Sequence, residues 1–258
     1  MSNFDRNAPV WGAGRAQQTS AVEMDQGLRS FMLGVYNNMS IGLAITGLAA
    51  IGISMLAIAG VSPTGKVTAL TPLGQALYLS PLKWVVMLAP LAFIFFFSFK
   101  AESMSSSSAR AMFFAFAAVM GVSLSSIFVV YTGESITKVF FITAATFGAL
   151  SLYGYTTKKS LSAMGSFLIM GLIGLVIASV VNIFLQSSAL SFAVSAIGVL
   201  VFAGLTAWDT QRLKEMYLYS DMDAESAAKL SVNGALSLYL NFINMFQMLL
   251  SLFGSKQE

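Results

Sequence analysis

Long apolar stretches separated by short polar ones fill the chain from residue 31 to residue 253. A helix needs roughly 20 mostly apolar residues to cross a bilayer, and seven stretches qualify as spans of this kind. The predicted spans are residues 31–60, 83–99, 111–131, 139–155, 164–185, 190–208 and 232–253. The pattern therefore predicts an all-α fold, a polytopic membrane bundle whose seven transmembrane helices form one domain over residues 29–254.

Two segments outside the spans have patterns of their own. Residues 1–28 are polar, contain Pro9, Gly12 and Gly14, and lack helical periodicity, so we expect a mobile tail. The fifth and sixth spans are separated only by residues 186–189. Those two helices should therefore form a tight antiparallel pair.

The composition supports a lipid environment and gives the bundle an orientation. Only 10% of the residues are charged, against about 25% in soluble domains. Cytoplasmic loops of membrane proteins retain Lys and Arg, and here the basic residues are divided unevenly between the two sides. One side has ten, at Arg6, Arg15, Arg29, Lys100, Arg110, Lys158, Lys159, Arg212, Lys214 and Lys229; the other has four, at Lys66, Lys83, Lys138 and Lys256. This count predicts a cytoplasmic N-terminus and, after seven spans, a C-terminus outside.

The chain contains no cysteine and no histidine. Thiol nucleophiles, haem ligation by histidine and the usual zinc sites are therefore excluded, as is a rhomboid-like protease, which needs a histidine. A presenilin-like protease needs two intramembrane aspartates, of which only one is available. The net charge of +3 is spread over several loops and gives no footprint for nucleic acid. We therefore expect no enzymatic activity, no cofactor and no nucleic-acid partner, with the lipid bilayer as the main partner.

The last predicted span differs from the others because polar residues recur along it at intervals of three to four. They are Ser237, Asn241, Asn244, Gln247 and Ser251. At 3.6 residues per turn they form one stripe. Hydrocarbon offers amides no hydrogen-bond partner, so the stripe should face the bundle interior or a wet cavity. It is either a hydrogen-bonded structural seam or the lining of a pore, and in both cases this helix should be central.

Asp209 is the acidic residue that borders directly on an apolar span. The predicted span ends at residue 208, which places Asp209 at the C-terminal end of its helix, where the helix dipole disfavours an anion. One interpretation is an interfacial acid that is solvated by water and paired with Arg212. The other is an ion ligand or proton sensor, with Thr210 and Gln211 as neighbours.

Several short runs carry a resemblance to a known family. Residues 203–211 read Ala-Gly-Leu-Thr-Ala-Trp-Asp-Thr-Gln, and residues 235–244 include Leu-Tyr-Leu-Asn-Phe-Ile-Asn. Tyr36, Asn37 and Met39 near the start of the first span, and residues 120–125 in the third, fit as well. In this order the runs resemble the helix signatures of the Bax inhibitor family, or transmembrane Bax inhibitor motif family. The resemblance covers about residues 25–252 and implies six helices around a central seventh, in a protein of the bacterial inner membrane.

The resemblance also implies a function. Family members are pH-sensitive calcium leak channels in which two aspartates, on the sixth and seventh helices, share a proton and help to control the pore. Asp209 falls on the first of these positions, as a candidate Ca²⁺ ligand and pH sensor, and Asn241 occupies the second. Two carboxylates in contact titrate as a unit, whereas an aspartate with an amide does not. We therefore expect a cation or calcium leak pathway whose dependence on pH is weak.

A second function is open, because some bacterial relatives modulate a membrane-bound AAA protease by binding it rather than by moving ions. The polar residues 2–28 are a candidate binding segment for such a partner. A sealed bundle and a leaky bundle share one hydrophobic pattern, so the sequence does not separate the two functions.

Overall fold

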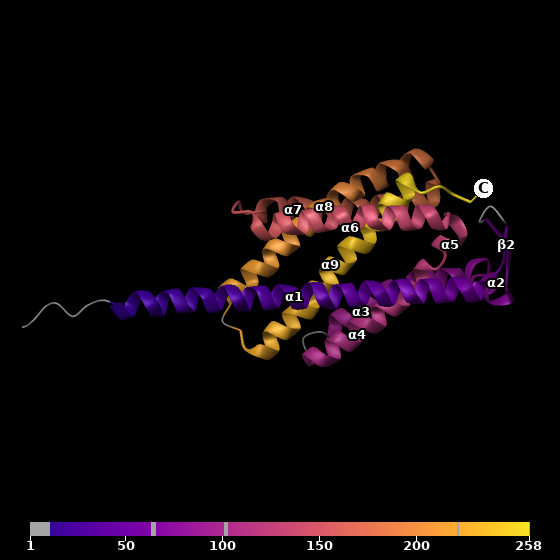
Figure 1. Cartoon of the computed structure of the whole chain (residues 1–258). Helices are drawn as coiled ribbons and strands as arrows, with labels where there is room; N and C mark the ends of the chain where they lie inside the picture. The colour runs from indigo at the N-terminus through magenta and orange to yellow at the C-terminus, as the bar shows by residue number, and fades with distance from the viewer. Residues whose placement is uncertain (1–10, 63–65, 101–102, 221, 258) are drawn as a thin grey trace, which may run out of the picture.

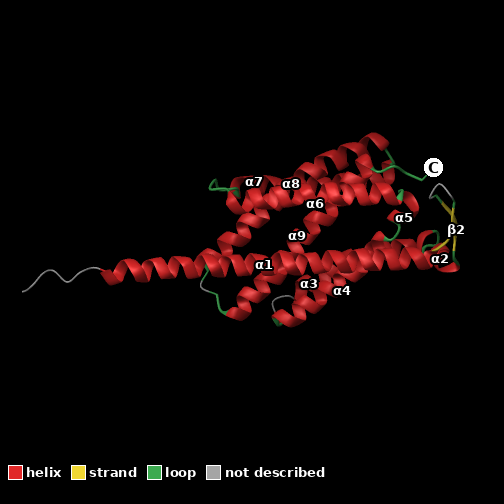
Figure 2. Ribbon diagram, viewed as in Figure 1, coloured by secondary structure: helices red, strands yellow, loops and turns green. Residues whose placement is uncertain are grey.

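The structure is a computed structural model that describes residues 11–62, 66–100, 103–220 and 222–257 (Figure 1). Helices dominate it, with one short two-stranded sheet (Figure 2). The helices are α1 (Trp11–Ala57), α2 (Pro72–Tyr78), α3 (Leu82–Lys100), α4 (Ser106–Leu124), α5 (Ile127–Val130), α6 (Gly133–Thr156), α7 (Ser162–Leu185), α8 (Ser188–Tyr219) and α9 (Ala224–Phe253), and the strands are β1 (Ile58–Val61) and β2 (Val67–Leu70). The all-α prediction is confirmed.

Six of the described helical segments are long and apolar enough to cross a membrane on their own. They correspond to α1, α4 with α5, α6, α7, α8 and α9. The remaining predicted span, residues 83–99, corresponds to α3. The part of α3 that the structure describes counts as a candidate span in combination with α2, from which it is bent by 63°. Pro81 stands between the two helices, and proline does not continue a helix.

Five of these helices begin at a side chain that caps the first turn. In each case a Ser, Thr or Asp oxygen accepts a hydrogen bond from the backbone N–H three residues further on, which satisfies a donor that the helix leaves open. The capping residues are Thr71, Ser105, Thr132, Ser187 and Asp223. The hydrogen bonds that Ser226 donates to Asp223 lower the pKa of that carboxyl below its usual value. Asp223 therefore caps α9 as an anion.

Helices α8 and α9 are longer than the hydrophobic pattern predicts. Helix α8 continues beyond residue 208 to Tyr219, and α9 begins at Ala224 rather than at residue 232. The charged residues after Trp208 end the apolar stretch but not the helix, because buried side chains such as Leu213 (6% exposed) still pack on the bundle. The stretch between the last two predicted spans therefore consists mainly of two helix ends joined by a short turn.

Helical structure extends into the N-terminal segment in a similar way, while the predicted mobility of this tail stays a prediction. Helix α1 begins at Trp11, so residues 11–28 are helical although they lack apolar periodicity. Good helix formers such as Ala16, Gln17 and Gln18 outweigh Gly12 and Gly14 in this stretch. Residues 1–10 of the predicted tail lie outside the described residues. The cytoplasmic location of the tail stays a prediction.

Helix α9 is the most buried of the candidate spans. The share of its most apolar window that is buried is 56%, against 11–33% in the other five. It packs against α1, α4, α6 and α8, while α3 packs on α4 and α7 packs on α8. Tyr239, Leu238 and Met245 are fully buried, and Figure 1 shows α9 crossing α1 obliquely toward α6 and α8.

The predicted tight pair of helices is confirmed for α7 and α8, which pack on each other. The turn consists of Gln186 and Ser187, and Gln186 adopts the left-handed conformation with φ of 49°. Asn182 closes this turn, because its side-chain oxygen accepts a hydrogen bond from the Ser187 N–H at 3.0 Å.

The end of the bundle opposite the start of α1 is covered by the β hairpin and the C-terminal segment (Figure 1). The Val67 N–H donates to the Gln257 side chain at 2.8 Å, and Gln257 donates in turn to the Tyr131 and Phe128 carbonyls. A bridge pairs Tyr131 with Lys256. These bonds tie the chain after α9 to the first loop, a connection that the sequence pattern does not contain.

Candidate functional site

Asp209 and Asn241 meet where α8 crosses α9. The Asn241 Nδ2 donates a hydrogen bond of 2.7 Å to the Asp209 Oδ2, so the structure brings together the two positions that the resemblance pairs. Asn241 is 6% exposed, and Asp209 is half-buried. Because α8 runs on to Tyr219, Asp209 lies inside the helix, and the predicted opposition of the helix dipole is wrong, since that effect fades beyond the last turn.

The predicted pairing of Asp209 with Arg212 is also corrected. In the described structure the Arg212 guanidinium lies over the Trp208 ring, 5.2 Å from its centroid, rather than against the carboxylate. Asp209 points toward α9, whereas Arg212 is exposed on the outside of α8. The positive charge therefore remains near Asp209 without forming a direct ion pair with it.

A cavity of about 620 Å³ opens beside this pair, between α3, α4, α7, α8 and α9. Four of its lining residues belong to the set singled out by the sequence, namely Asp209, Ser237, Asn241 and Asn244. Most of the other side chains in its wall are apolar, such as Ile94, Phe116, Leu172 and Phe202. The polar face of α9 thus forms one wall of an otherwise hydrophobic cavity.

A second cavity, of about 390 Å³, continues along α9 toward the end of the bundle that the hairpin covers. Asn244 lines both cavities, and Gln247 lines the second together with Tyr131. The Asn244 Nδ2 donates to the Leu240 carbonyl of its own helix at 2.8 Å. Asp209, Ser237, Asn241, Asn244 and Gln247 therefore follow one another along two adjoining cavities.

Ser251 departs from this arrangement. It lines neither of the two cavities, and its Oγ accepts a hydrogen bond of 3.1 Å from the Ser195 Oγ of α8. Ser251 therefore makes a structural contact between α8 and α9. Its position does not support the prediction that it lines a pore.

The neighbours of Asp209 have structural partners. Thr210 shares a hydrogen bond of 3.0 Å with Ser151 of α6, and Ser151 shares one of 2.6 Å with the Tyr36 hydroxyl of α1. The Gln211 side chain accepts from the Leu161 N–H and donates to the Lys159 carbonyl, which ties α8 to the start of α7. Ser151 is recognisable in the sequence as a lone hydroxyl residue inside an apolar span. The sequence does not show that it bonds to Thr210 and Tyr36.

A resident metal site would need more ligands than Asp209 provides. Among the described residues, no group of three or more His, Cys, Asp or Glu side chains is placed to hold a metal ion. Ca²⁺ takes six to eight oxygen ligands, and the cavity offers one carboxylate together with amide and hydroxyl groups. The role of Asp209 as a metal ligand stays a prediction.

The fold and these cavities define a polytopic α-helical membrane protein whose most buried helix carries a polar face. The model of the family described as inhibitor of apoptosis-promoting Bax1 matches residues 28–258, and the chain belongs to this Bax inhibitor family. A protein of Caulobacter vibrioides is 44% identical over the whole of both chains. The inner membrane protein YbhL of Escherichia coli is 42% identical over 92% of this chain and 97% of its own. A membrane protein of Streptococcus pyogenes is 37% identical over 60% of this chain and 66% of its own.

Proposed function

We propose that the protein is a passive leak pathway for cations, including Ca²⁺, along the polar face of α9. The observation that supports this function is the pair of cavities that adjoin at Asn244 and contain Asp209, Ser237, Asn241 and Gln247. Polar groups at membrane depth are costly, and they commonly mark the route of an ion. The route would run from Asp209 to Gln247.

The chemistry of the route favours cations. Asn241 and Asn244 use their amide N–H groups within the protein, which leaves their carbonyl oxygens to replace part of the hydration shell of a passing ion. Asp209 adds a negative charge at one end of the larger cavity. A passive route of this kind needs no catalytic group and no cofactor.

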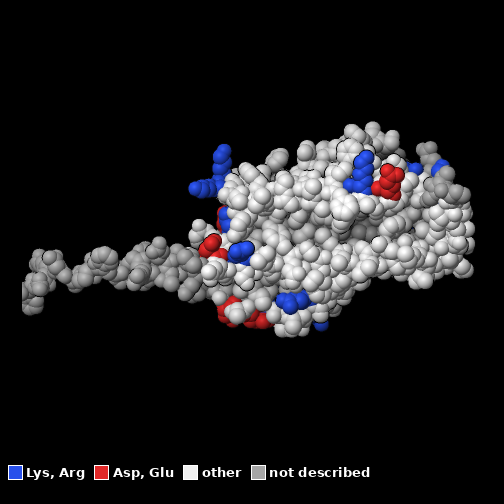
Figure 3. All heavy atoms as spheres, viewed as in Figure 1, with Lys and Arg blue, Asp and Glu red and all other residues white. Residues whose placement is uncertain are grey.

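The proposed placement in the membrane takes α2 and α3 together as a seventh span, with α9 enclosed by the other helices. Few charged side chains appear on the face shown in Figure 3, where most of the surface is uncharged, as expected for a surface largely in contact with lipid. The name of the Escherichia coli relative suggests the inner membrane. The count of basic residues then puts the N-terminus in the cytoplasm.

Ion flux into vesicles that contain the purified protein tests the function. We expect entry of Ca²⁺ and of monovalent cations into vesicles that hold the native chain, and a strong loss of flux for Asn244→Leu, which replaces the amide shared by both cavities with an apolar side chain. Asn37→Leu is the matched control, because Asn37 is exposed on α1 and lines neither cavity. A native chain that passes no ions, or an Asn244→Leu chain that conducts like the control, would exclude the pathway.

The alternative, binding of a membrane-bound AAA protease, stays a prediction. A pull-down with the native chain from membranes, run beside the flux measurement, distinguishes the two functions. If a protease copurifies with the chain and no ion flux is measured, the protein is a protease modulator and not a leak pathway.

A further inference from the structure

A third cleft, of about 540 Å³, lies between α1 and α6 and shares no lining residue with the two cavities along α9. Its walls are mainly apolar, with Met32 and Leu33 from α1 and Phe147 and Leu152 from α6. Leu33 and Leu152 are 59% and 62% exposed. Because both helices are candidate membrane spans, the side chains around this cleft face hydrocarbon rather than water.

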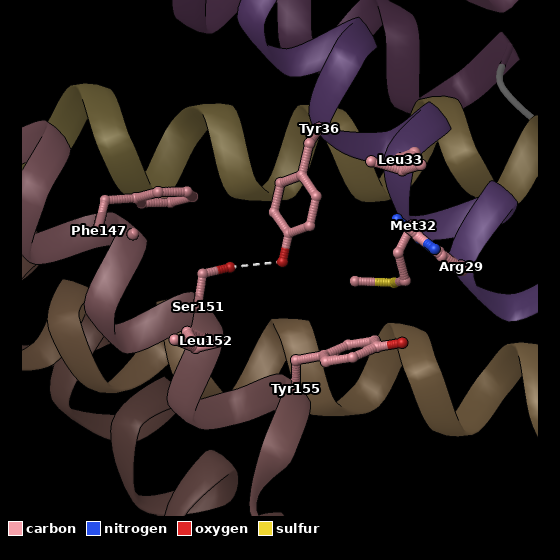
Figure 4. Close-up of a pocket in the computed structure, with 9 residues that line it drawn as sticks. Arg29, Met32, Leu33, Tyr36, Phe147, Ser151, Leu152 and Tyr155 are labelled. Carbon is pink, nitrogen blue, oxygen red and sulfur yellow. Dashed lines mark hydrogen bonds between the residues drawn. The ribbon is translucent and has the colours of Figure 1, made fainter. Parts of the chain in front are cut away.

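One end of the cleft is polar. Figure 4 shows Arg29 and the Tyr155 hydroxyl toward one end, Phe147 toward the other, and Tyr36 pointing across the cleft to Ser151. The Tyr36 and Ser151 hydroxyls are 2.6 Å apart and satisfy each other. Arg29 is exposed and is the charged residue in the lining.

The polar end is part of a wider basic region. Lys214 donates to the Tyr155 carbonyl at 2.7 Å, and its Nζ lies 5.7 Å from the centroid of the Tyr155 ring. Lys158 and Lys159 follow directly after α6. Basic pockets between transmembrane helices on the cytoplasmic side suit anionic lipid headgroups, and this is the side to which the basic-residue count assigns these residues.

We propose that the cleft between α1 and α6 binds a phospholipid with a net negative headgroup. The phosphate contacts Arg29, and an acyl chain lies along Met32 and Leu33 toward Phe147. The ligand must combine a negative charge with a long apolar part, because the cleft has a cation at one end and hydrophobic walls along the rest. The bilayer supplies molecules of this chemistry at the depth of the cleft.

Gly148 offers a direct steric test. It lines the cleft, and a Cβ added to it would meet no atom within 4 Å. Gly148→Leu therefore starts from open space and adds an apolar side chain at the wall of the cleft. Gly174→Leu is the matched control, because Gly174 is outside the cleft on α7, where an added Cβ also meets no atom within 4 Å.

The measurement is native mass spectrometry of the purified protein after equilibration with equal amounts of phosphatidylglycerol and phosphatidylethanolamine. We expect the native chain and Gly174→Leu to retain phosphatidylglycerol preferentially, and Gly148→Leu to lose that retained lipid. Arg29→Gln should lower the ratio of bound phosphatidylglycerol to phosphatidylethanolamine by about fivefold, the usual contribution of one basic residue near a lipid surface. Arg110→Gln, on the exposed start of α4, should leave the ratio unchanged.

Two results would overturn the proposal. Equal lipid retention by Gly148→Leu and Gly174→Leu would mean that the acyl chain lies elsewhere. Displacement of the bound lipid by excess inorganic phosphate would mean that the site recognises the phosphate group alone. If Gly148→Leu fails to fold, the proposal is tested by Arg29→Gln alone. An unchanged ratio of bound phosphatidylglycerol to phosphatidylethanolamine in that variant would contradict the proposal.

Discussion

The hydroxyl of Tyr239 lies 2.6 Å from the hydroxyl of Thr46, and this bond joins α9 to α1 inside the bundle. The Thr46 hydroxyl also lies 2.9 Å from the Ala117 carbonyl oxygen and 3.0 Å from the Gly42 carbonyl oxygen, and its single proton is donated to these acceptors. The Tyr239 side chain is fully buried, and its ring contacts Phe113 and Phe116 of α4 edge-on. One tyrosine thus connects three helices that are far apart in the sequence.

Tyr239→Phe should destabilise the bundle by about 0.5–1.5 kcal/mol, the usual net contribution of a single hydrogen bond. The ring and its aromatic contacts remain, so only the bond to Thr46 is removed. Tyr153→Phe is the control, because Tyr153 is 50% exposed on α6. Unfolding by denaturant in detergent measures the difference, and equal free energies of unfolding for the two variants would show that the bond makes no net contribution.

Gly154→Ala should destabilise the contact between α6 and α8 by about 1–3 kcal/mol, the usual cost of overpacking. A Cβ on Gly154 would lie 2.2 Å from the Ala207 carbonyl oxygen, and backbone cannot move aside cheaply. Gly148→Ala on the same helix meets no atom within 4 Å and should be neutral or slightly stabilising. Thermal unfolding of both variants tests this contrast, which would disappear if α6 and α8 were separated in the membrane.

The Asp209–Asn241 pair predicts how any ion flux depends on pH. Asn241→Asp would place a second carboxylate within hydrogen-bond distance of Asp209. Two carboxylates in contact share a proton and titrate as a unit, so the flux should become steeper in its response to pH. Asp209→Asn should remove the response while keeping the shape of the side chain.

Flux measured between about pH 5 and pH 8 in vesicles with each variant tests this prediction. Ser251→Ala is a suitable control, because Ser251 lines neither cavity along α9. If Asn241→Asp leaves the pH profile unchanged and Asp209→Asn has no effect, the pair has only a structural role.

The orientation and the number of spans can be tested together. With α2 and α3 as one span, the two ends of the chain lie on opposite sides, whereas six spans would put them on the same side. The chain has no native cysteine, so single cysteines at Ser2, near the N-terminus, and at the exposed position Lys256 report the two ends of the chain. An impermeant thiol reagent added outside intact cells should label Lys256→Cys and not Ser2→Cys. Equal labelling of the two variants would mean an even number of spans, and the reverse result would invert the topology.

The apolar stretches predicted which segments become helices, because burial in lipid requires long runs of apolar residues. They predicted the ends of these helices poorly. Helix α8 continues through Arg212 and Lys214, because a helix needs only its backbone hydrogen bonds and one partly buried face. A search for uninterrupted apolar residues detects neither of these. The hairpin of β1 and β2 was missed because its stability depends on contacts with Gln257, far away in the chain.

The candidate site was predicted more completely than the helix ends. The α9 stripe was recognisable from its spacing, and the resemblance supplied the pairing of Asp209 with Asn241. Ser251 has the spacing of the stripe but lies against Ser195, because helical periodicity gives a face and does not say which neighbouring helix covers it. The Arg29 cleft could not be predicted, since it depends on the gap between two helices that are distant in sequence.

The burial of α9 has a consequence for how the protein assembles. This helix follows, in the chain, the helices α1, α4, α6 and α8 against which it packs. Those four helices therefore enter the membrane before the partner for their inner faces has been synthesised. Until α9 is in place, Thr46 lacks the Tyr239 bond, and the inner faces of these four helices lack the helix that covers them in the complete bundle. The bundle is therefore complete only after α9 has inserted. Variants that slow the insertion of α9 should be degraded rather than accumulate as partly active forms.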